Sequence, residues 1–371
     1  MLEKHKNQLL KVKRLNKVEA LKQLAFEKKS FDGFLVTNPT NLLYFTGFDG
    51  AFCLLIPKKG ESTIYVYNVN YELAKTEGKS FKVELVKMGE KLGEKIAAQV
   101  KASKIKKLAL DTLSYDLYRM FAKALRGTAK LKIQGNLIWE LRKVKNEQEL
   151  ELMRKAGELT VTGMKAAYET IKPGVKEIEV AAEIEYAMRR KGSWGTAFES
   201  IVASGTRSAY PHGGCTDKKI RNGDIVVVDI GATYQCYRSD MTRTMVAGKP
   251  TQKQEKLYEV VKVAQEKAFQ AIKPNVKCKD IDGVARKSIA DAGYGEYFVH
   301  SLGHGVGLEV HELPVLSPAS KDRLKVGNVV TNEPGIYLVG YGGFRIEDTV
   351  LVKPRKAEKL VDGFYTLTAE R

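Results

Sequence analysis

The sequence predicts two domains: an α/β domain over residues 1–143, followed by an α+β domain over residues 144–371. In the first part, short apolar runs typical of strands alternate with helical periodicity, which is the pattern of an α/β fold. In the second part, helices alternate with two strand–turn–strand segments. The charged passage from Trp139 to Glu151 separates the two parts, and a chain of 371 residues is long enough for two hydrophobic cores.

The individual elements follow from local patterns. Apolar residues at helical spacing predict an amphipathic helix over residues 1–29, and residues 42–48 form a further segment. Apolar runs bounded by turn residues predict strands at 33–36, 51–57, 62–67, 82–86 and 107–111. Helices with Gly or Pro near their ends are expected near 90–103, 114–126, 145–171, 175–191, 251–273 and 278–292.

Two acidic residues of the second domain lie symmetrically about an expected turn. Residues 224–246 contain a strand, a polar turn and a second strand, with Asp229 in the first strand and Asp240 at the start of the second. The midpoint between them falls at Tyr234 and Gln235, where we expect the turn. Opposed side chains in an antiparallel pair stand about 4.5–5.5 Å apart on one face. The spacing therefore predicts that the two carboxylates face each other across the ladder.

A second hairpin carries another acidic pair. Glu333 and Glu347 are centred on Gly340, which lies in a glycine-rich turn. Asp229 follows an apolar run and Glu347 precedes one, so neither fits a solvent-facing strand position. Four acidic side chains would converge from the two hairpins, and buried charges of one sign require cations.

These acids and one histidine have the donor types of a two-metal centre. Carboxylates with one imidazole suit Mn²⁺, Co²⁺, Fe²⁺ or Zn²⁺, and a donor set without cysteine argues against a closed structural zinc site. Bridging carboxylates can hold two ions about 3.5–4 Å apart. The expected ligands are Asp229, Asp240, His304, Glu333 and Glu347.

The histidines are concentrated near the acids. Four of the five lie in the same half of the chain, and three of these, His300, His304 and His311, fall within twelve residues. Glycines on both sides of His304 permit the close backbone approach expected where a ligand is presented from a loop or a sheet edge. His212 lies in a turn-rich segment, and His5 lies near the N-terminus.

The ordered motifs around these residues resemble those of the pita-bread metallopeptidases and, within that family, the Xaa-Pro dipeptidases (prolidases) and aminopeptidase P. The motifs are Val-Asp229-Ile-Gly-Ala-x-Tyr, Ser-Asp240-Met-Thr-Arg-Thr, His300-x-x-Gly-His304-Gly-x-Gly-Leu-x-x-His311-Glu-x-Pro, Asn-Glu333-Pro-Gly-Ile-Tyr and Arg345-Ile-Glu347-Asp. The likeness covers nearly the whole chain. It implies a creatinase/prolidase-like α/β domain followed by a pseudo-symmetric α+β pita-bread catalytic domain with two metal-bearing hairpins.

The resemblance implies roles for the ligands that agree with their donor chemistry. Asp229 is expected to bind one ion and His304 the other, while Asp240 and Glu347 bridge them. Glu333 is expected to bind one ion and to assist proton transfer.

Further residues have counterparts near the site in that family. The resemblance implies that His212 and His311 hydrogen-bond the reacting amide or the product carboxylate. It also implies that His300 orients its neighbours, that Tyr337 lies near the site, and that Arg345 orients the bridging carboxylates.

Several functions remain open at this stage. The resemblance implies a homodimeric enzyme acting on a peptide substrate at the bond before proline, either in Xaa-Pro dipeptides or, as in aminopeptidase P, at the N-terminus of longer peptides. Methionine aminopeptidase shares the metal ligands but lacks this kind of N-terminal domain. Creatine amidinohydrolase shares the fold without the ligands. A non-catalytic binding protein on the same fold is an alternative of a different class, and the complete ligand set argues against it.

Composition bears on partners and compartment. The formal net charge is +18, and residues 1–143 contribute +14 of it, with 28 Lys and Arg against 14 Asp and Glu. No aromatic interleaving or nucleic-acid motif accompanies these lysines, so a solvated face is favoured over a nucleic-acid surface. Four cysteines without paired spacing, and no apolar run near the ~20 residues of a membrane span, indicate a cytoplasmic protein.

Overall fold

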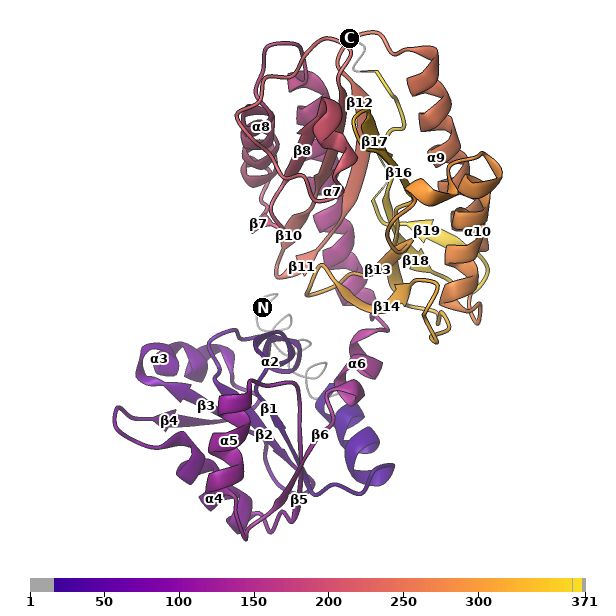
Figure 1. Ribbon diagram of the computed structural model, residues 1–371. Helices are drawn as coiled ribbons and strands as arrows, with labels where there is room; N and C mark the ends of the chain where they lie inside the picture. Colours follow the sequence, from indigo (N-terminus) through magenta and orange to yellow (C-terminus); the bar gives the residue numbers. More distant parts are fainter. Residues whose placement is uncertain (1–16, 362, 369–371) are drawn as a thin grey trace. The chain divides into compact units, whose positions relative to one another are not determined.

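The computed structural model describes residues 17–361 and 363–368. The chain divides between Arg142 and Lys143 into two compact units (Figure 1). Of the helix expected over residues 1–29, residues 1–16 lie outside the described part, and His5 lies among them. Residues 17–27 are helical and end in a single π-helical turn, Gln23–Glu27.

The first unit is built on a six-stranded mixed sheet in the order β4-β3-β2-β1-β5-β6. β1 pairs in parallel with β5 and antiparallel with β2, so the α/β expectation is confirmed with one antiparallel insertion. The strands are β1 Gly33–Val36, β2 Cys53–Pro57, β3 Thr63–Tyr67, β4 Lys82–Val86, β5 Lys107–Leu110 and β6 Lys130–Ile133. The helices are α2 Pro39–Thr46, α3 Asn68–Glu77, α4 Leu92–Ala102, α5 Tyr115–Ala124 and α6 Asn136–Arg142.

The segment at residues 42–48 lies mostly in helix α2, which has clear end signals. The Asn38 side chain accepts a hydrogen bond from the Asn41 backbone N–H, and Pro39 occupies the first helical position. Gly47 ends the helix with φ 65°, a conformation that favours glycine. These signals identify a helix more reliably than the apolar content of the segment does.

A buried carboxylate fixes the start of this helix to the sheet. Asp111, which directly follows β5, accepts hydrogen bonds from the backbone N–H groups of Thr37 and Asn38. It also accepts from the Thr37 hydroxyl and from the Asn41 side-chain amide. Four donors on one buried carboxylate hold the β1–α2 connection against the end of β5.

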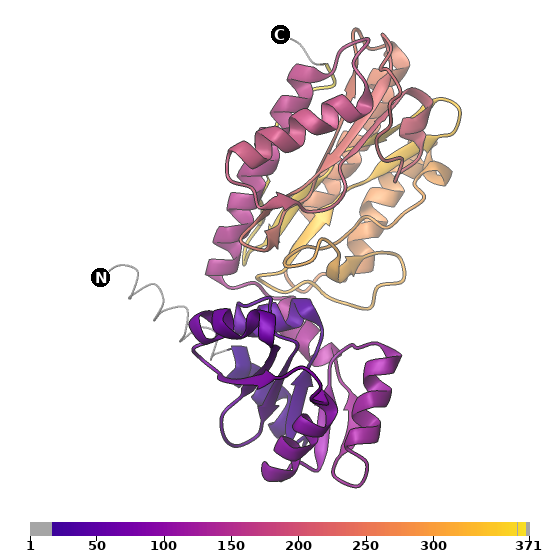
Figure 2. The same ribbon diagram turned by 90° about the vertical axis from the view of Figure 1, so that its left-hand side faces the viewer.

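The second unit contains two halves, each with a helix pair packed on antiparallel strands. One half packs α7 and α8 against a sheet of order β12-β9-β8, and the other packs α9 and α10 against a sheet of order β14-β13-β15-β18-β19. Both views show the two helix pairs on opposite sides of the central strands (Figures 1 and 2). This is the α+β arrangement that the sequence predicts.

The helices of this unit follow the predicted ranges to within two residues at each end. They are α7 Glu147–Thr170, α8 Glu177–Arg190, α9 Gln252–Ala271 and α10 Cys278–Asp291, with short helices η2 Gly205–Ala209 and η3 Gly295–Tyr297. The first-half strands are β7 Gly195–Thr196, β8 Ile201–Ser204, β9 Ile225–Ile230, β10 Ala232–Tyr234, β11 Tyr237–Arg238 and β12 Met241–Val246. The second-half strands are β13 Gly303–Gly305, β14 Glu312–Leu316, β15 Val329–Asn332, β16 Gly335–Leu338, β17 Gly342–Arg345, β18 Asp348–Val352 and β19 Ala357–Lys359.

The first acidic hairpin forms with a register that differs from the predicted one. Its turn consists of Gln235 and Cys236, both with positive φ, which is typical of a tight two-residue hairpin. The turn centre thus lies one residue later than predicted, and Asp229 faces Thr242 across the ladder rather than Asp240. A shift of two residues preserves the face, so Asp240 becomes a diagonal neighbour of Asp229 on the same side.

The second acidic hairpin forms in the predicted register. Asn332 pairs with Asp348, and one step further in this register Glu333 lies opposite Glu347. The turn contains Gly340 with φ 84°, as its glycine-rich sequence predicts. In the described part of the chain, no helix combines the length and apolar character needed to span a membrane.

Candidate metal centre

The backbone around His304 passes very close to its neighbouring strands. A Cβ atom on Gly303 would lie 2.1 Å from the Thr331 carbonyl oxygen, and one on Gly305 would lie 2.5 Å from the Leu313 carbonyl oxygen. Any side chain at either position would clash with backbone atoms. The close approach expected from the glycines is confirmed, and it brings the His304 backbone against β15.

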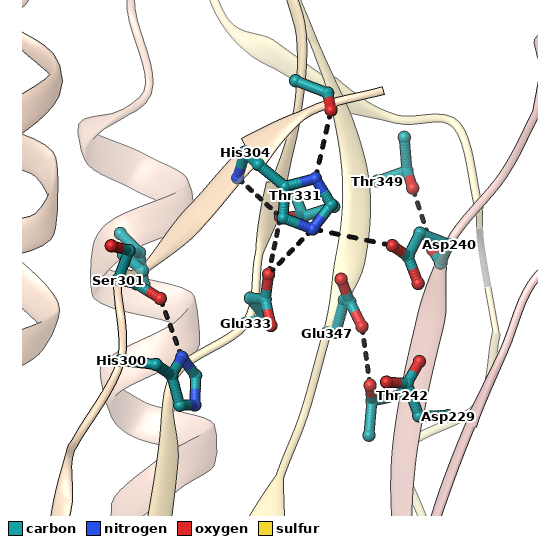
Figure 3. A network of polar contacts seen from close by, with 12 residues as sticks. Asp229, Asp240, Thr242, His300, Ser301, His304, Thr331, Glu333, Glu347 and Thr349 are labelled. Atoms are coloured by element: carbon teal, nitrogen blue, oxygen red, sulfur yellow. Dashed lines mark hydrogen bonds and ion pairs between the residues drawn. The ribbon is translucent and has the colours of Figure 1, made fainter. Parts of the chain in front are cut away.

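The His304 ring presents one nitrogen to the acidic residues. Its Nδ1 lies 3.0 Å from the Gly305 carbonyl oxygen, so Nδ1 carries the proton and donates it to that carbonyl. Its Nε2 then points toward Glu333 Oε1 at 3.2 Å and Asp240 Oδ2 at 3.7 Å (Figure 3). A backbone bond that fixes the tautomer in this way is typical of a metal-binding histidine.

Carboxylates from both hairpins surround this nitrogen. Ligand atoms of Asp240, His304 and Glu347 all lie within 4.8 Å of one another. Burial and the charges of neighbouring acids raise the pKa of both Asp240 and Glu347 well above the usual range. Burial also opposes ionisation of Glu333, but the His304 ring outweighs it and lowers the pKa of this carboxyl to about 2.

Several oxygens of these carboxylates have no protein donor to bind. Asp229 Oδ1, Asp240 Oδ1 and Glu347 Oε1 are buried without a hydrogen-bond partner among the residues that the structure describes. A buried oxygen in this state is costly, whereas a bound cation would satisfy it. The residues present therefore fit a centre of divalent cations held by N and O donors.

Asp229 lies beside this group and has a second partner. Its Oδ2 accepts a hydrogen bond from Arg345 Nη2 at 2.6 Å, which leaves Oδ1 directed toward the other acids (Figure 3). Asp229 is the one residue of the apolar strand β9 that is not fully buried. The Arg345 guanidinium thus orients the Asp229 carboxylate through Oδ2, the oxygen that does not face the other acids.

The guanidinium begins a chain of hydrogen bonds through two further predicted residues. Arg345 Nη1 donates to the Tyr337 hydroxyl at 2.8 Å, and this hydroxyl lies 2.9 Å from His300 Nε2. His300 Nδ1 donates to the Ser301 carbonyl at 2.8 Å, so its Nε2 accepts from Tyr337. Burial lowers the pKa of His300, with a smaller contribution from the Arg345 charge, in keeping with a neutral ring.

The two histidines expected to contact substrate lie at the exposed side of the centre. The His311 ring is stacked edge-on against His304, with 4.4 Å between ring centroids. Desolvation and the charge of His304 lower the pKa of His311. His212 is exposed on the loop that follows β8, and its neighbour Pro211 accepts a hydrogen bond from Arg345 at 3.3 Å.

Threonine hydroxyls that the sequence analysis did not select hold several of these groups. The Thr242 hydroxyl donates to Glu347 Oε2 at 2.6 Å, and the Thr331 hydroxyl donates to Glu333 Oε1 at 3.0 Å (Figure 3). Strand periodicity offered a signal for Thr242, since it lies two residues after Asp240 and so shares its face. Without the register, nothing distinguished it from other strand threonines.

Comparison with known proteins places the chain among relatives of one family. The model of metallopeptidase family M24 matches residues 151–354, and that of the creatinase/prolidase N-terminal domain matches residues 17–144. The Xaa-Pro dipeptidase of Pyrococcus furiosus is 42% identical over 338 residues, which cover 90% of this chain and 94% of that protein.

Solved structures agree with this assignment. The Xaa-Pro dipeptidase from Bacillus anthracis matches with a TM-score of 0.91 and 36% identity, covering 96% of this chain and 99% of that one. The X-Pro aminopeptidase from Thermotoga maritima matches with a TM-score of 0.85 and 36% identity, covering 93% of this chain and 99% of that one. This chain therefore belongs to metallopeptidase family M24 and carries the creatinase/prolidase N-terminal domain.

Proposed function

We propose that this chain is a two-metal peptidase that hydrolyses the peptide bond before proline in Xaa-Pro dipeptides. The observation that carries the proline assignment is its likeness to proteins of that activity, among them the Pyrococcus furiosus Xaa-Pro dipeptidase at 42% identity over 90% of this chain. The buried carboxylate oxygens without a hydrogen-bond partner in the described residues support the metal-dependent part of the proposal.

Five residues would hold the two cations: Asp229, Asp240, His304, Glu333 and Glu347. Their N and O donors suit Mn²⁺ or Co²⁺ first, and Fe²⁺ or Zn²⁺ are compatible with the same set. When bound, the cations supply Lewis acidity that polarises the scissile carbonyl and makes water a stronger nucleophile.

The protein's own groups move the proton and orient the substrate. Glu333 accepts a proton from the attacking water and delivers it to the proline nitrogen, which has no N–H and must be protonated to leave. His311 and His212 hydrogen-bond the substrate amide or carboxylate. Arg345 orients Asp229, and the Tyr337 hydroxyl, which lies between Arg345 and His300, orients Arg345 in turn.

Two substrates separate the dipeptidase from the second candidate, an aminopeptidase that removes one residue from longer peptides. The likeness to the Thermotoga maritima X-Pro aminopeptidase, at 36% identity, is the observation that supports this second candidate. Purified enzyme loaded with Mn²⁺ or Co²⁺ should hydrolyse Ala-Pro much faster than Ala-Pro-Ala. The reverse preference would establish the aminopeptidase. Cleavage of Met-Ala-Ser, with both proline peptides untouched, would overturn the proline assignment.

Assembly and location complete the proposal. We infer a homodimer in the cytoplasm, supported by the family resemblance and by the absence of a disulfide among the four cysteines, all of which are described. Size-exclusion chromatography with light scattering tests the dimer. The basic residues 1–143 are proposed to be a solvated face, so nucleic-acid binding should be weak and should vanish at moderate salt. Selective binding at physiological salt would contradict that part.

A further inference from the structure

A buried carboxylate outside the metal centre binds both ends of the loop that carries His212. Glu177 is the first residue of α8, and its side chain is fully buried. Its Oε1 accepts hydrogen bonds from the Ser204 backbone N–H at 2.8 Å and from the Ser204 hydroxyl at 2.7 Å. Its Oε2 accepts from the Thr216 backbone N–H at 3.0 Å and from the Thr216 hydroxyl at 2.6 Å. The two oxygens thus bind the residues just before and just after residues 205–215.

A guanidinium within the loop extends this contact to the neighbour of His212. Arg207 Nη1 lies 3.5 Å from Glu177 Oε2, and Arg207 Nη2 donates to the Gly213 carbonyl. Because Gly213 directly follows His212, one arginine connects the buried carboxylate with the backbone at this histidine. The arginine also offsets the charge that Glu177 carries into the interior.

The same loop contacts strand β17 beside the metal-binding residues. The Gly343 N–H donates to the Ser208 hydroxyl at 2.9 Å, and Arg345 Nη1 donates to the Pro211 carbonyl at 3.3 Å. The His212 ring is exposed, and among the described residues we find no hydrogen bond to it. The backbone of the loop therefore determines where the His212 side chain leaves the chain.

We propose that Glu177 is a positioning residue for the reaction, because it fixes both ends of residues 205–215 and so holds His212 where it meets the substrate. The inference rests on the proposed function in one respect, namely that His212 contacts the peptide. A simple helix-capping role does not account for the contacts of Glu177. Capping of α8 is performed by Glu179, whose carboxylate accepts from the Lys176 N–H at 2.8 Å.

The substitution Glu177→Gln isolates the role of the carboxylate. The glutamine side chain has one acceptor oxygen in place of two. If this oxygen keeps the two Ser204 donors, the NH₂ group faces the Thr216 N–H, and both of these donors are left without an acceptor. The Thr216 end of the loop should then detach. Because a displacement of about 1 Å can cost up to ~10²-fold in rate, we expect kcat/KM for Ala-Pro to fall ~10–100-fold.

Glu179→Gln is the matched control, since it makes the same change two residues away on the same helix at an exposed position. We expect its kcat/KM to stay within about twofold of the wild type, because the glutamine oxygen can still accept the Lys176 N–H and the side chain binds neither Ser204 nor Thr216. Elemental analysis should find the same metal content in both variants and in the wild type. Loss of metal in Glu177→Gln would show that the residue supports the metal centre instead, and would overturn the proposal.

A double-mutant cycle tests whether Glu177 acts through His212. If it does, Glu177→Gln should change kcat/KM by less than about twofold in a His212→Ala background, because coupled residues give non-additive effects. A full ~10-fold or greater loss in both backgrounds would refute this route. Should Glu177→Gln fail to fold, Thr216→Val removes one donor to Glu177 together with the acceptor of the Lys218 N–H. Its smaller loss in kcat/KM should likewise disappear in the His212→Ala background.

Hydrogen exchange of the full chain separates this inference from the proposed function. Glu177→Gln should speed amide exchange within residues 205–216, while Glu179→Gln should not. This measurement needs no substrate. It therefore still tests whether Glu177 fixes the loop if the wild type fails to cleave Ala-Pro and the proposed function is wrong. Unchanged exchange in residues 205–216 would show that Glu177 does not fix the loop and would overturn the proposal.

Discussion

Replacing Thr242 by valine should weaken metal binding while the fold is kept. The Thr242 hydroxyl is fully buried between two site residues, donating to Glu347 Oε2 at 2.6 Å and accepting from Arg345 Nε at 3.0 Å. Valine has nearly the same shape without the hydroxyl. The substitution therefore removes one hydrogen bond to a carboxylate that we propose as a metal ligand, and it leaves the guanidinium N–H without its acceptor.

The size of the effect follows from the charge that Glu347 would carry as a metal ligand. A hydrogen bond to a charged group contributes about 1.5–3 kcal/mol, and about 1.4 kcal/mol corresponds to a factor of ten in an equilibrium constant. We therefore expect Thr242→Val to lose ~10–100-fold in metal affinity, which is the range found when groups that orient metal ligands are removed. Thr242→Ser retains the hydroxyl and should stay close to the wild type.

Thr244 provides a matched control on the same strand. It is also fully buried, but its hydroxyl bonds only the backbone carbonyl and N–H of Arg345, each at 2.9 Å. Thr244→Val thus makes the same chemical change without touching a carboxylate. Affinity for Mn²⁺ would be measured by competition with a chelator, and kcat with Ala-Pro. Equal losses of affinity in the two valine variants would refute the reasoning.

Three further outcomes are expected. Elemental analysis after reconstitution should approach two divalent ions per chain, and a stable maximum of one would contradict a dinuclear centre. His304→Ala and Asp240→Asn should each lose at least ~10²–10³ in kcat with an unchanged circular dichroism spectrum, whereas near wild-type rates would contradict the assigned roles. Asp111→Asn should destabilise the first unit by about 3–6 kcal/mol, because two of four hydrogen bonds to a buried carboxylate are lost. The control is Asp32→Asn, which keeps the single oxygen that accepts from two backbone N–H groups. Urea unfolding should therefore show a lower midpoint for Asp111→Asn than for Asp32→Asn, and equal midpoints would argue against this account.

Residue type and spacing were sufficient to predict that several of these acidic side chains and His304 come together. Glu333 and Glu347 lie opposite one another because the chain on either side of Gly340 has equal length, and sequence alone carries that information. Helix ranges in the second unit were predicted well because long amphipathic segments have a strong 3.6-residue period. The glycines around His304 likewise indicated close backbone packing before the partner strand was known.

Tertiary structure decided what these local patterns leave open. The turn of the first hairpin is centred on Gln235 and Cys236, one residue later than predicted. The spacing of the acidic residues does not show which residues adopt the positive φ that a tight turn needs. The contacts of Glu177 with Ser204 and Thr216 join segments 27 and 39 residues away, and a single acid at the start of a helix looks the same in sequence whether it caps that helix or binds a distant loop. The sequence alone determined which groups could bind a metal. Only the fold decided which carboxylate oxygens lack a hydrogen-bond donor. It also decided that the hydroxyls of Thr242 and Thr331 and the Arg345 guanidinium bind the other carboxylate oxygens, because these contacts depend on long-range packing.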